Sequence, residues 1–321
     1  MSDPILHPEQ VDDVVRPARG WKRAAAYIVG LGLLAASVYL AVNKADWSHL
    51  RQADRSDIAL LCALVVANVL TNALLFWLAT KPFEVPGQPV KLREWLAMVA
   101  GTALLNYAGA KAGLIGRIAY LKKYHGISYR ANVFTLVALA AGTASIYILI
   151  AAILLWRDGV DTTGLTLGTL ALVVLSLVGW LFIKPAVGRF GAGQIARRDL
   201  PVWIFVWSIL RIVDAVVYAG RLMIASHVLG KPIDLELALT AAVVCNFVVM
   251  AAPVPGGLGI REWLGAAIVK WGFKGAVVMD LAQGAGILVV DRVAEVVTLL
   301  ALGPLALLYL HYRANKIDNN R

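Results

Sequence analysis

The sequence predicts an all-α integral membrane protein with about six full spans and two re-entrant helical hairpins in an inverted-repeat arrangement. Three observations lead to this prediction. Hydrophobic residues make up 60% of the 321 positions, charged residues only 16%, and the mean hydropathy is +0.73. Apolar runs of spanning length recur along the chain. Two shorter apolar stretches are each interrupted by glycine or proline. The composition excludes an ordinary soluble domain.

The elements follow from the apolar runs taken in order. Residues 1–20 are polar and proline-containing, so we expect a disordered cytoplasmic tail there. A single transmembrane domain is expected over 21–312, followed by a short cytoplasmic tail at 313–321. Full spans are predicted at 24–42, 58–80, 131–156, 165–183, 202–229 and 283–312. The first repeat would cover about 58–156 and the second about 202–312.

The second interrupted stretch, 252–262, is the feature around which the chain is organised. Its helix-breaking residues are Pro253, Pro255, Gly256, Gly257 and Gly259. Proline and glycine oppose a continuous helix, yet both flanks are apolar enough to lie in lipid. Irregular backbone at membrane depth requires cover from protein or from a water-filled cavity. We therefore expect a re-entrant tip whose glycines have positive φ or touch a ligand; the alternative is a loop between two full spans.

The first interrupted stretch, 107–117, resembles the second. It contains Gly109, Lys111, Gly113 and Arg117, again between apolar segments too short to span comfortably. Interrupted hydrophobic segments at corresponding places in two halves of a chain are typical of a transporter binding site. The two hairpins are expected at 94–124 and 237–270.

Basic residues predict the orientation. If both hairpins return to the side of entry, most lysines and arginines fall in loops on one side, which also holds both termini. The positive-inside rule places that side in the cytoplasm. Two full spans in place of each hairpin would leave the loops on the same sides, so charge does not separate these alternatives.

Charged residues inside apolar runs predict the site, because each is costly in lipid without a partner or a wet cavity. Arg211 and Asp214 are spaced to pair on one helix face, either as a structural pair or as part of a binding site. Arg261 and Glu262 follow the second break directly, which favours a functional role for them over a purely structural one. Near the ends of spans, arginines such as Arg117 and Arg292 have an alternative explanation, which is snorkelling to the headgroups.

Several chemistries are missing from the sequence. The histidines have no metal-ligand spacing, so neither a metal site nor a metal cofactor is expected. There is no G-x-S-x-G elbow and no phosphate-binding P-loop, so we expect no catalytic residue or nucleotide cofactor of those types. The net charge of +10 lies mainly in short loops, and nucleic acid is not an expected partner.

The run Pro253-x-Pro255-Gly256-Gly257-x-Gly259-x-x-Glu262 resembles the signature of the transmembrane region of bacterial lysylphosphatidylglycerol synthases. Stand-alone membrane proteins share this signature, including one associated with hopanoid biosynthesis. The resemblance covers about 21–312. It implies the lipid-flipping half of those synthases, in a bacterial cytoplasmic (inner) membrane, without their soluble aminoacyl-transferase domain.

The family's other motifs match in part. Gly113 and Arg117 fit the glycine and arginine of its earlier motif, and Arg292 resembles its late arginine. Gly109 stands where the family has proline, and Leu114 where it has glutamate. These two departures weigh against a mechanism that needs two symmetric carboxylates.

We therefore expect a non-enzymatic transporter that moves an anionic or zwitterionic amphiphilic lipid between leaflets. Arg117, Arg261 and Arg292 would hold the headgroup phosphate, because arginine forks match phosphate oxygens. Glu262 would orient an arginine, receive a cationic headgroup or carry a proton, and Arg211 and Lys111 are further candidate binding residues. The alternatives are a membrane-embedded lipid-modifying enzyme or its subunit, in hopanoid or lipid-linked sugar metabolism, and a carrier for a small anion. The oligomeric state stays open, with a homodimer as one arrangement.

Overall fold

The computed structural model describes residues 20–44, 47–108, 112–157, 200–251, 257, 259–271 and 279–319, and within them all regular structure is helical. The α-helices are α2 (Gly20–Lys44), α3 (Arg55–Thr80), α4 (Leu92–Ala108), α5 (Ala112–His125), α6 (Tyr129–Arg157), α8 (Leu200–Val228), α9 (Leu235–Ala251), α10 (Ile260–Trp271) and α11 (Leu281–Asp318). Two short 3₁₀ turns, His49–Gln52 and Lys81–Phe83, flank α3.

Four of the described helices are long and apolar enough to cross a membrane. These segments are Arg55–Phe83, Tyr129–Leu154, Val202–Val228 and Leu281–Asp318. They coincide with the spans expected at 58–80, 131–156, 202–229 and 283–312. The span expected at 24–42 falls within α2 (Gly20–Lys44). The span expected at 165–183 lies outside the described residues, as do 1–19 of the N-terminal tail.

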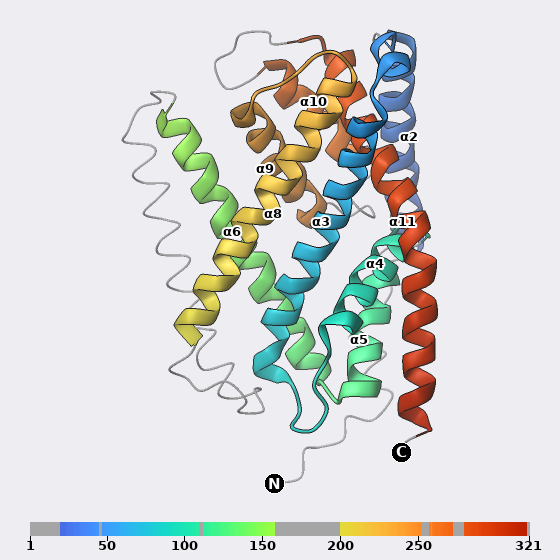
Figure 1. Cartoon of the computed structure of the whole chain (residues 1–321), viewed down its shortest axis with the longest axis vertical. Coiled ribbons are helices and arrows are strands. Elements are labelled where there is room, and N and C mark those ends of the chain that lie inside the picture. Colours follow the sequence, from blue (N-terminus) through green and yellow to red (C-terminus); the bar gives the residue numbers. More distant parts are fainter. Residues whose placement is uncertain are drawn as a thin grey trace.

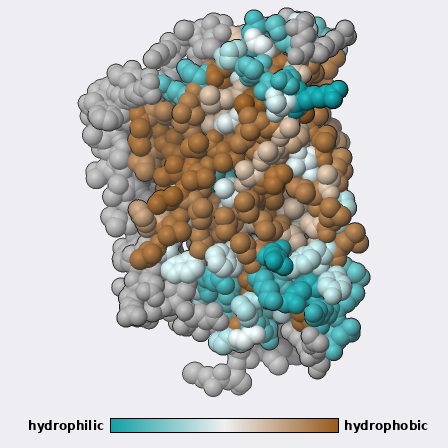
Figure 2. All heavy atoms as spheres, in the orientation of Figure 1, coloured by the Kyte–Doolittle hydropathy of each residue, from teal (hydrophilic) through white to brown (hydrophobic). Residues whose placement is uncertain are grey.

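The surface of the helical body has the polarity pattern of a membrane protein. Hydrophobic residues form a broad band across its middle, and hydrophilic residues gather at both ends (Figure 2). Leucine, isoleucine and valine side chains on α3, α6, α8 and α11 are exposed. Such a surface is stable only when lipid or another apolar partner covers it.

Two pairs of short helices lie at opposite ends of the molecule. The α4–α5 pair is in the lower half of the view in Figure 1 and the α9–α10 pair is in the upper half. The helices of each pair contact one another, and α4 and α10 also contact α11. Helices α4 and α9 have 17 residues each, too few for a comfortable membrane crossing. The ranges 94–124 and 237–270, where the two hairpins are expected, fall in the α4–α5 and α9–α10 pairs.

Small residues let the helices approach closely. A Cβ atom added to Gly284 of α11 would lie 2.9 Å from the carbonyl oxygen of Ala266 in α10. Membrane helices use small residues in this way, since close backbone approach maximises van der Waals contact without a hydrophobic driving force. The contact holds the middle of α10 beside the first turn of α11. The C-terminal end of α11 runs to Asp318, past the expected boundary at Tyr312.

Candidate functional site: a buried cluster of arginines and carboxylates

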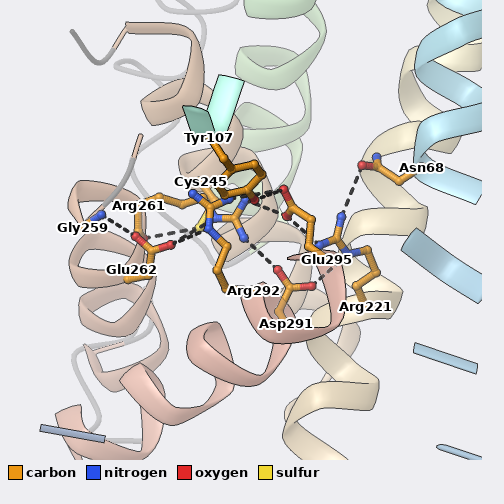
Figure 3. A network of polar contacts seen from close by, with 10 residues as sticks. All are labelled: Asn68, Tyr107, Arg221, Cys245, Gly259, Arg261, Glu262, Asp291, Arg292 and Glu295. Atoms are coloured by element: carbon orange, nitrogen blue, oxygen red, sulfur yellow. Dashed lines mark hydrogen bonds and ion pairs between the residues drawn. The ribbon is translucent and has the colours of Figure 1, made fainter. Parts of the chain in front are cut away.

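Six charged side chains meet between α8, α10 and α11. Three are guanidinium groups and three are carboxylates, so their formal charges cancel. They are Arg221 of α8, Arg261 and Glu262 of α10, and Asp291, Arg292 and Glu295 of α11, hereafter called the charge cluster (Figure 3). All six side chains are less than one-fifth exposed. Because their charges balance, the mutual attraction of these groups offsets part of the desolvation cost of burying them.

Asp291 is the buried centre of the cluster. Its side chain is 0% exposed, and each carboxylate oxygen accepts one hydrogen bond. Arg221 Nε donates to one oxygen at 2.8 Å, and Arg261 Nη2 donates to the other at 2.8 Å. Two guanidinium groups from two different helices therefore share this one carboxylate, which joins α8 and α10 to α11.

Glu295 is the shared and most accessible carboxylate, with its side chain 17% exposed. It lies one helical turn beyond Asp291, as the spacing of four residues predicts. Four donors reach it: Arg221 Nη2 at 3.0 Å, Arg261 Nη1 at 3.2 Å, Arg292 Nη1 at 3.3 Å and Tyr107 Oη at 2.8 Å. Tyr107 comes from the last turn of α4, so Glu295 links the first helix pair to the second.

Glu262 ties the cluster to the interrupted stretch. Its Oε2 accepts a hydrogen bond from the backbone N–H of Gly259 at 2.7 Å. A glutamate in the first turn of a helix often caps the helix start in this way. Its Oε1 faces Arg292 Nε at 3.4 Å and Arg261 Nε at 3.9 Å, without hydrogen-bond geometry. Glu262 therefore orients the start of α10 and contributes charge to both arginines.

Both described glycines of the second break have left-handed backbone. Gly257 has φ of 65° and Gly259 has φ of 77°, a region that side chains disfavour. This satisfies the first of the two conditions expected for them. The remaining residues singled out in this stretch, Pro253, Pro255 and Gly256, lie outside the described residues.

The first break has a different local structure. Gly113, in the first turn of α5, packs so closely on α4 that an added Cβ would collide with the carbonyl oxygen of Thr102. Its N–H donates to the side-chain oxygen of Asn106 at 3.2 Å. Gly113 is therefore required by close packing. Gly109 and Lys111 lie outside the described residues.

Arg117 is not part of the charge cluster. Its guanidinium lies over the Phe76 ring, 3.9 Å from the centroid, and 5.9 Å from the Trp95 centroid. The structure thus brings Arg261, Glu262 and Arg292 together, and places Arg117 against aromatic rings between α3, α4 and α5.

Arg211 and Asp214 form a second polar group, on α8. Arg211 Nη1 donates to Asp214 Oδ2 at 2.8 Å, as their spacing predicts. The other oxygen of Asp214 accepts from three side chains of α3: Asn68, Thr71 and Asn72. Asp214 is therefore saturated and holds α3 against α8. Asn68 also accepts from Arg221 at 3.3 Å, which connects this group to the charge cluster.

The sequence around Arg221 does not reveal its partners, because its carboxylates lie 70 and 74 residues further along the chain. The available signal for its partners was the balance of arginines and carboxylates in the apolar runs. With Arg211 and Asp214 paired on their own helix, the three arginines left in the apolar runs after residue 200 are matched by the three carboxylates Glu262, Asp291 and Glu295. Tyr107 and Asn68 carry no such signal, since they bear no charge.

Comparison with protein-family models and with curated proteins finds no match to this chain. Among the described residues, no group of histidine, cysteine and acidic side chains is arranged to hold a metal ion. The class of protein is therefore defined by the fold and the site: an all-helical protein with four helices able to cross a membrane and a buried, charge-balanced cluster between its helices. Chemically, the cluster is suited to bind an anion in exchange for one of its own carboxylates.

Proposed function

We propose that the protein moves an amphiphilic lipid with a phosphate-containing headgroup between the leaflets of a bacterial cytoplasmic membrane. The observation that carries the proposal is Glu295. This partly exposed carboxylate takes hydrogen bonds from all three guanidinium groups of the cluster. It occupies the position at which an anionic ligand would meet the largest number of cationic donors.

Charge balance favours a particular ligand. If Glu295 turns away, the cluster retains three guanidinium groups and two carboxylates, for a net charge of +1. A phosphodiester carries a single negative charge in both anionic and zwitterionic phospholipids, so it would restore neutrality. Guanidinium forks and the Tyr107 hydroxyl are suited to its oxygens. Asp291 would stay in place, since its two bonds to Arg221 and Arg261 are fully buried.

The arrangement of the helices supports transport. We infer that α4–α5 and α9–α10 are re-entrant hairpins of two inverted repeats, in which α3 and α6 correspond to α8 and α11. The contacts of α3 with α4, and of α4 with α5, have counterparts in those of α8 with α9 and of α9 with α10. The charge cluster takes Arg261 and Glu262 from one hairpin and is contacted by Tyr107 from the other, as expected for a site between such repeats.

The same arrangement suggests an orientation. The lower end in Figure 1 would be cytoplasmic, because the connection from α3 to α4 at that end includes Lys81 and Lys91. The α4–α5 hairpin would then enter from the cytoplasm and the α9–α10 hairpin from the opposite face.

Reconstituted vesicles test the proposal. A phospholipid with a fluorophore on its acyl chain is placed in both leaflets, and dithionite added outside quenches the outer leaflet. Vesicles with the protein should lose nearly all fluorescence, and protein-free vesicles about half. In Arg292→Lys the charge stays but the fork is lost. We therefore expect transport roughly 10- to 150-fold slower, which corresponds to the loss of a charge-assisted hydrogen bond worth roughly 1.5–3 kcal/mol.

The matched control is Arg130→Lys, which makes the same change at an exposed position in the first turn of α6. It should transport like the wild type. Equal rates for Arg292→Lys and the wild type, at equal protein content, would remove Arg292 from the binding site. Wild-type vesicles indistinguishable from protein-free ones would remove lipid transport itself.

A further inference from the structure

A pocket of about 260 Å³ lies between α4, α5 and the C-terminal half of α11. None of the six residues of the charge cluster lines it. Much of its wall is apolar and comes from Met98, Leu105, Leu307 and Leu310. Helix α4 packs against both α5 and α11, and the α4–α5 pair lies in the lower half of Figure 1.

Arg117 lines this pocket and is only 8% exposed. In the part of the chain that the structure describes, its guanidinium makes no hydrogen bond and no ion pair, and it contacts the rings of Phe76 and Trp95. An aromatic face returns only part of the hydration that a buried cation loses. A buried charge without a counter-ion is among the most costly arrangements in a protein, so its persistence points to a ligand.

The buried carboxylate on α4 does not serve Arg117. Glu94 Oε1 accepts a hydrogen bond from Arg313 Nε at 2.6 Å. Its Oε2 accepts from the backbone N–H of Lys91 at 3.0 Å and faces His125 Nε2 at 3.5 Å. Glu94 therefore holds the start of α4 to the end of α11, and Arg117 has no carboxylate partner among the described residues.

A second donor faces the same pocket. Tyr120 is one helical turn beyond Arg117, and its buried hydroxyl makes no hydrogen bond within the described ranges. Within the described residues, a guanidinium and a phenol without hydrogen-bond acceptors therefore line one largely apolar pocket. Buried polar groups nearly always have hydrogen-bond partners, so two neighbouring groups without one require an explanation.

We propose that this pocket is a second anion site, which holds the singly charged phosphodiester of an amphiphile on Arg117 and Tyr120. The apolar wall from α4 and α11 covers the first part of its chain. The inference does not rest on the charge cluster, because the two sites share no residue. In a lipid transporter this pocket would be an intermediate binding site near one membrane face. In a protein with another function it would be a regulatory lipid site.

Native mass spectrometry of the purified full chain in detergent tests the site. The probe is lysophosphatidylglycerol, with glycerophosphoglycerol as the same headgroup without a chain and monoacylglycerol as the same chain without phosphate. Arg117→Gln should weaken binding of the probe by at least about tenfold, and Tyr120→Phe should weaken it less. The exposed Arg130→Gln should leave binding unchanged. The wild type and these three variants are compared again with Arg292→Gln added to each. Binding that persists with Arg292→Gln is assigned to the pocket.

Thermal unfolding without the probe supplies a second readout. Because Arg117→Gln removes a buried charge that has no counter-ion among the described residues, the midpoint should rise. A lowered midpoint would assign the guanidinium to aromatic packing and overturn the proposal. Binding within about twofold of wild type in Arg117→Gln would also overturn it. Equal binding of either fragment probe would replace it with a free-anion site or a plain apolar groove. None of these outcomes depends on the flipping assay, so the two proposals can fail separately.

Discussion

Asp291→Asn is the sharpest perturbation of the charge cluster. Asparagine has nearly the same shape, but it removes the negative charge and replaces one acceptor oxygen with a donor. Asp291 is fully buried and accepts hydrogen bonds at 2.8 Å from both Arg221 and Arg261. Removing one partner of a buried ion pair typically costs about 3–5 kcal/mol. Since this carboxylate serves two guanidinium groups, we expect a loss near the upper end, about 4–5 kcal/mol.

The assay is reversible unfolding in mixed micelles, as sodium dodecyl sulfate is titrated in and helicity is followed by circular dichroism. Asp318→Asn is the matched control, because Asp318 is exposed and pairs with the exposed Lys123 at 3.2 Å. Such a pair is worth about 0–1 kcal/mol. Adding Arg221→Gln to Asp291→Asn restores charge balance and should recover about 1–3 kcal/mol. A loss below about 1 kcal/mol for Asp291→Asn would refute its role as the counter-ion of both arginines.

Two further predictions concern packing and topology. Gly113→Ala should destabilise the protein by about 1–3 kcal/mol in thermal unfolding, because the added methyl meets the carbonyl oxygen of Thr102. The control Gly116→Ala has open space at its Cβ and should be neutral or stabilising. Equal effects of the two substitutions would contradict the close approach of Gly113 to α4. Cysteine at Ser48 should react with an impermeant thiol reagent from outside the cell and cysteine at Gln88 only after the membrane is opened; the reverse pattern would invert the proposed orientation.

Local signals predicted much of the fold. The spans at 58–80 and 202–229 match α3 and α8 to within a few residues, because the hydropathy of a lipid-exposed helix is a property of its own residues. The end of α11 was harder to place. The apolar run ends at Tyr312, but the helix continues through polar sequence, where Arg313 reaches Glu94 on α4. That contact depends on packing between segments 219 residues apart and leaves no local pattern.

Only part of the candidate site was predictable, because some of its residues carry a local signal and others depend on contacts between distant segments. Arg261, Glu262 and Arg292 could be selected from the sequence, since a charge in an apolar run demands a partner. The position of Glu295 as the shared acceptor could not, because three of its four donors come from other helices. Arg117 lies after a glycine break much like the one before Arg261, so sequence alone could not separate a residue of the charge cluster from one against aromatic rings.

The distance in sequence between Arg221 and its carboxylates has a consequence for synthesis. Arg211 and Asp214 can pair as soon as α8 forms, but Arg221 waits for Asp291, which lies 70 residues further along the chain. At about 5–20 residues per second, translation leaves that arginine without a carboxylate partner for roughly 4–14 seconds. An arginine at the centre of a span costs about 2.5–3.5 kcal/mol on insertion scales. During that interval α8 must stay beside the translocon or another insertion factor, and a chain interrupted before α11 would display an unpaired arginine to the quality-control proteases of the membrane.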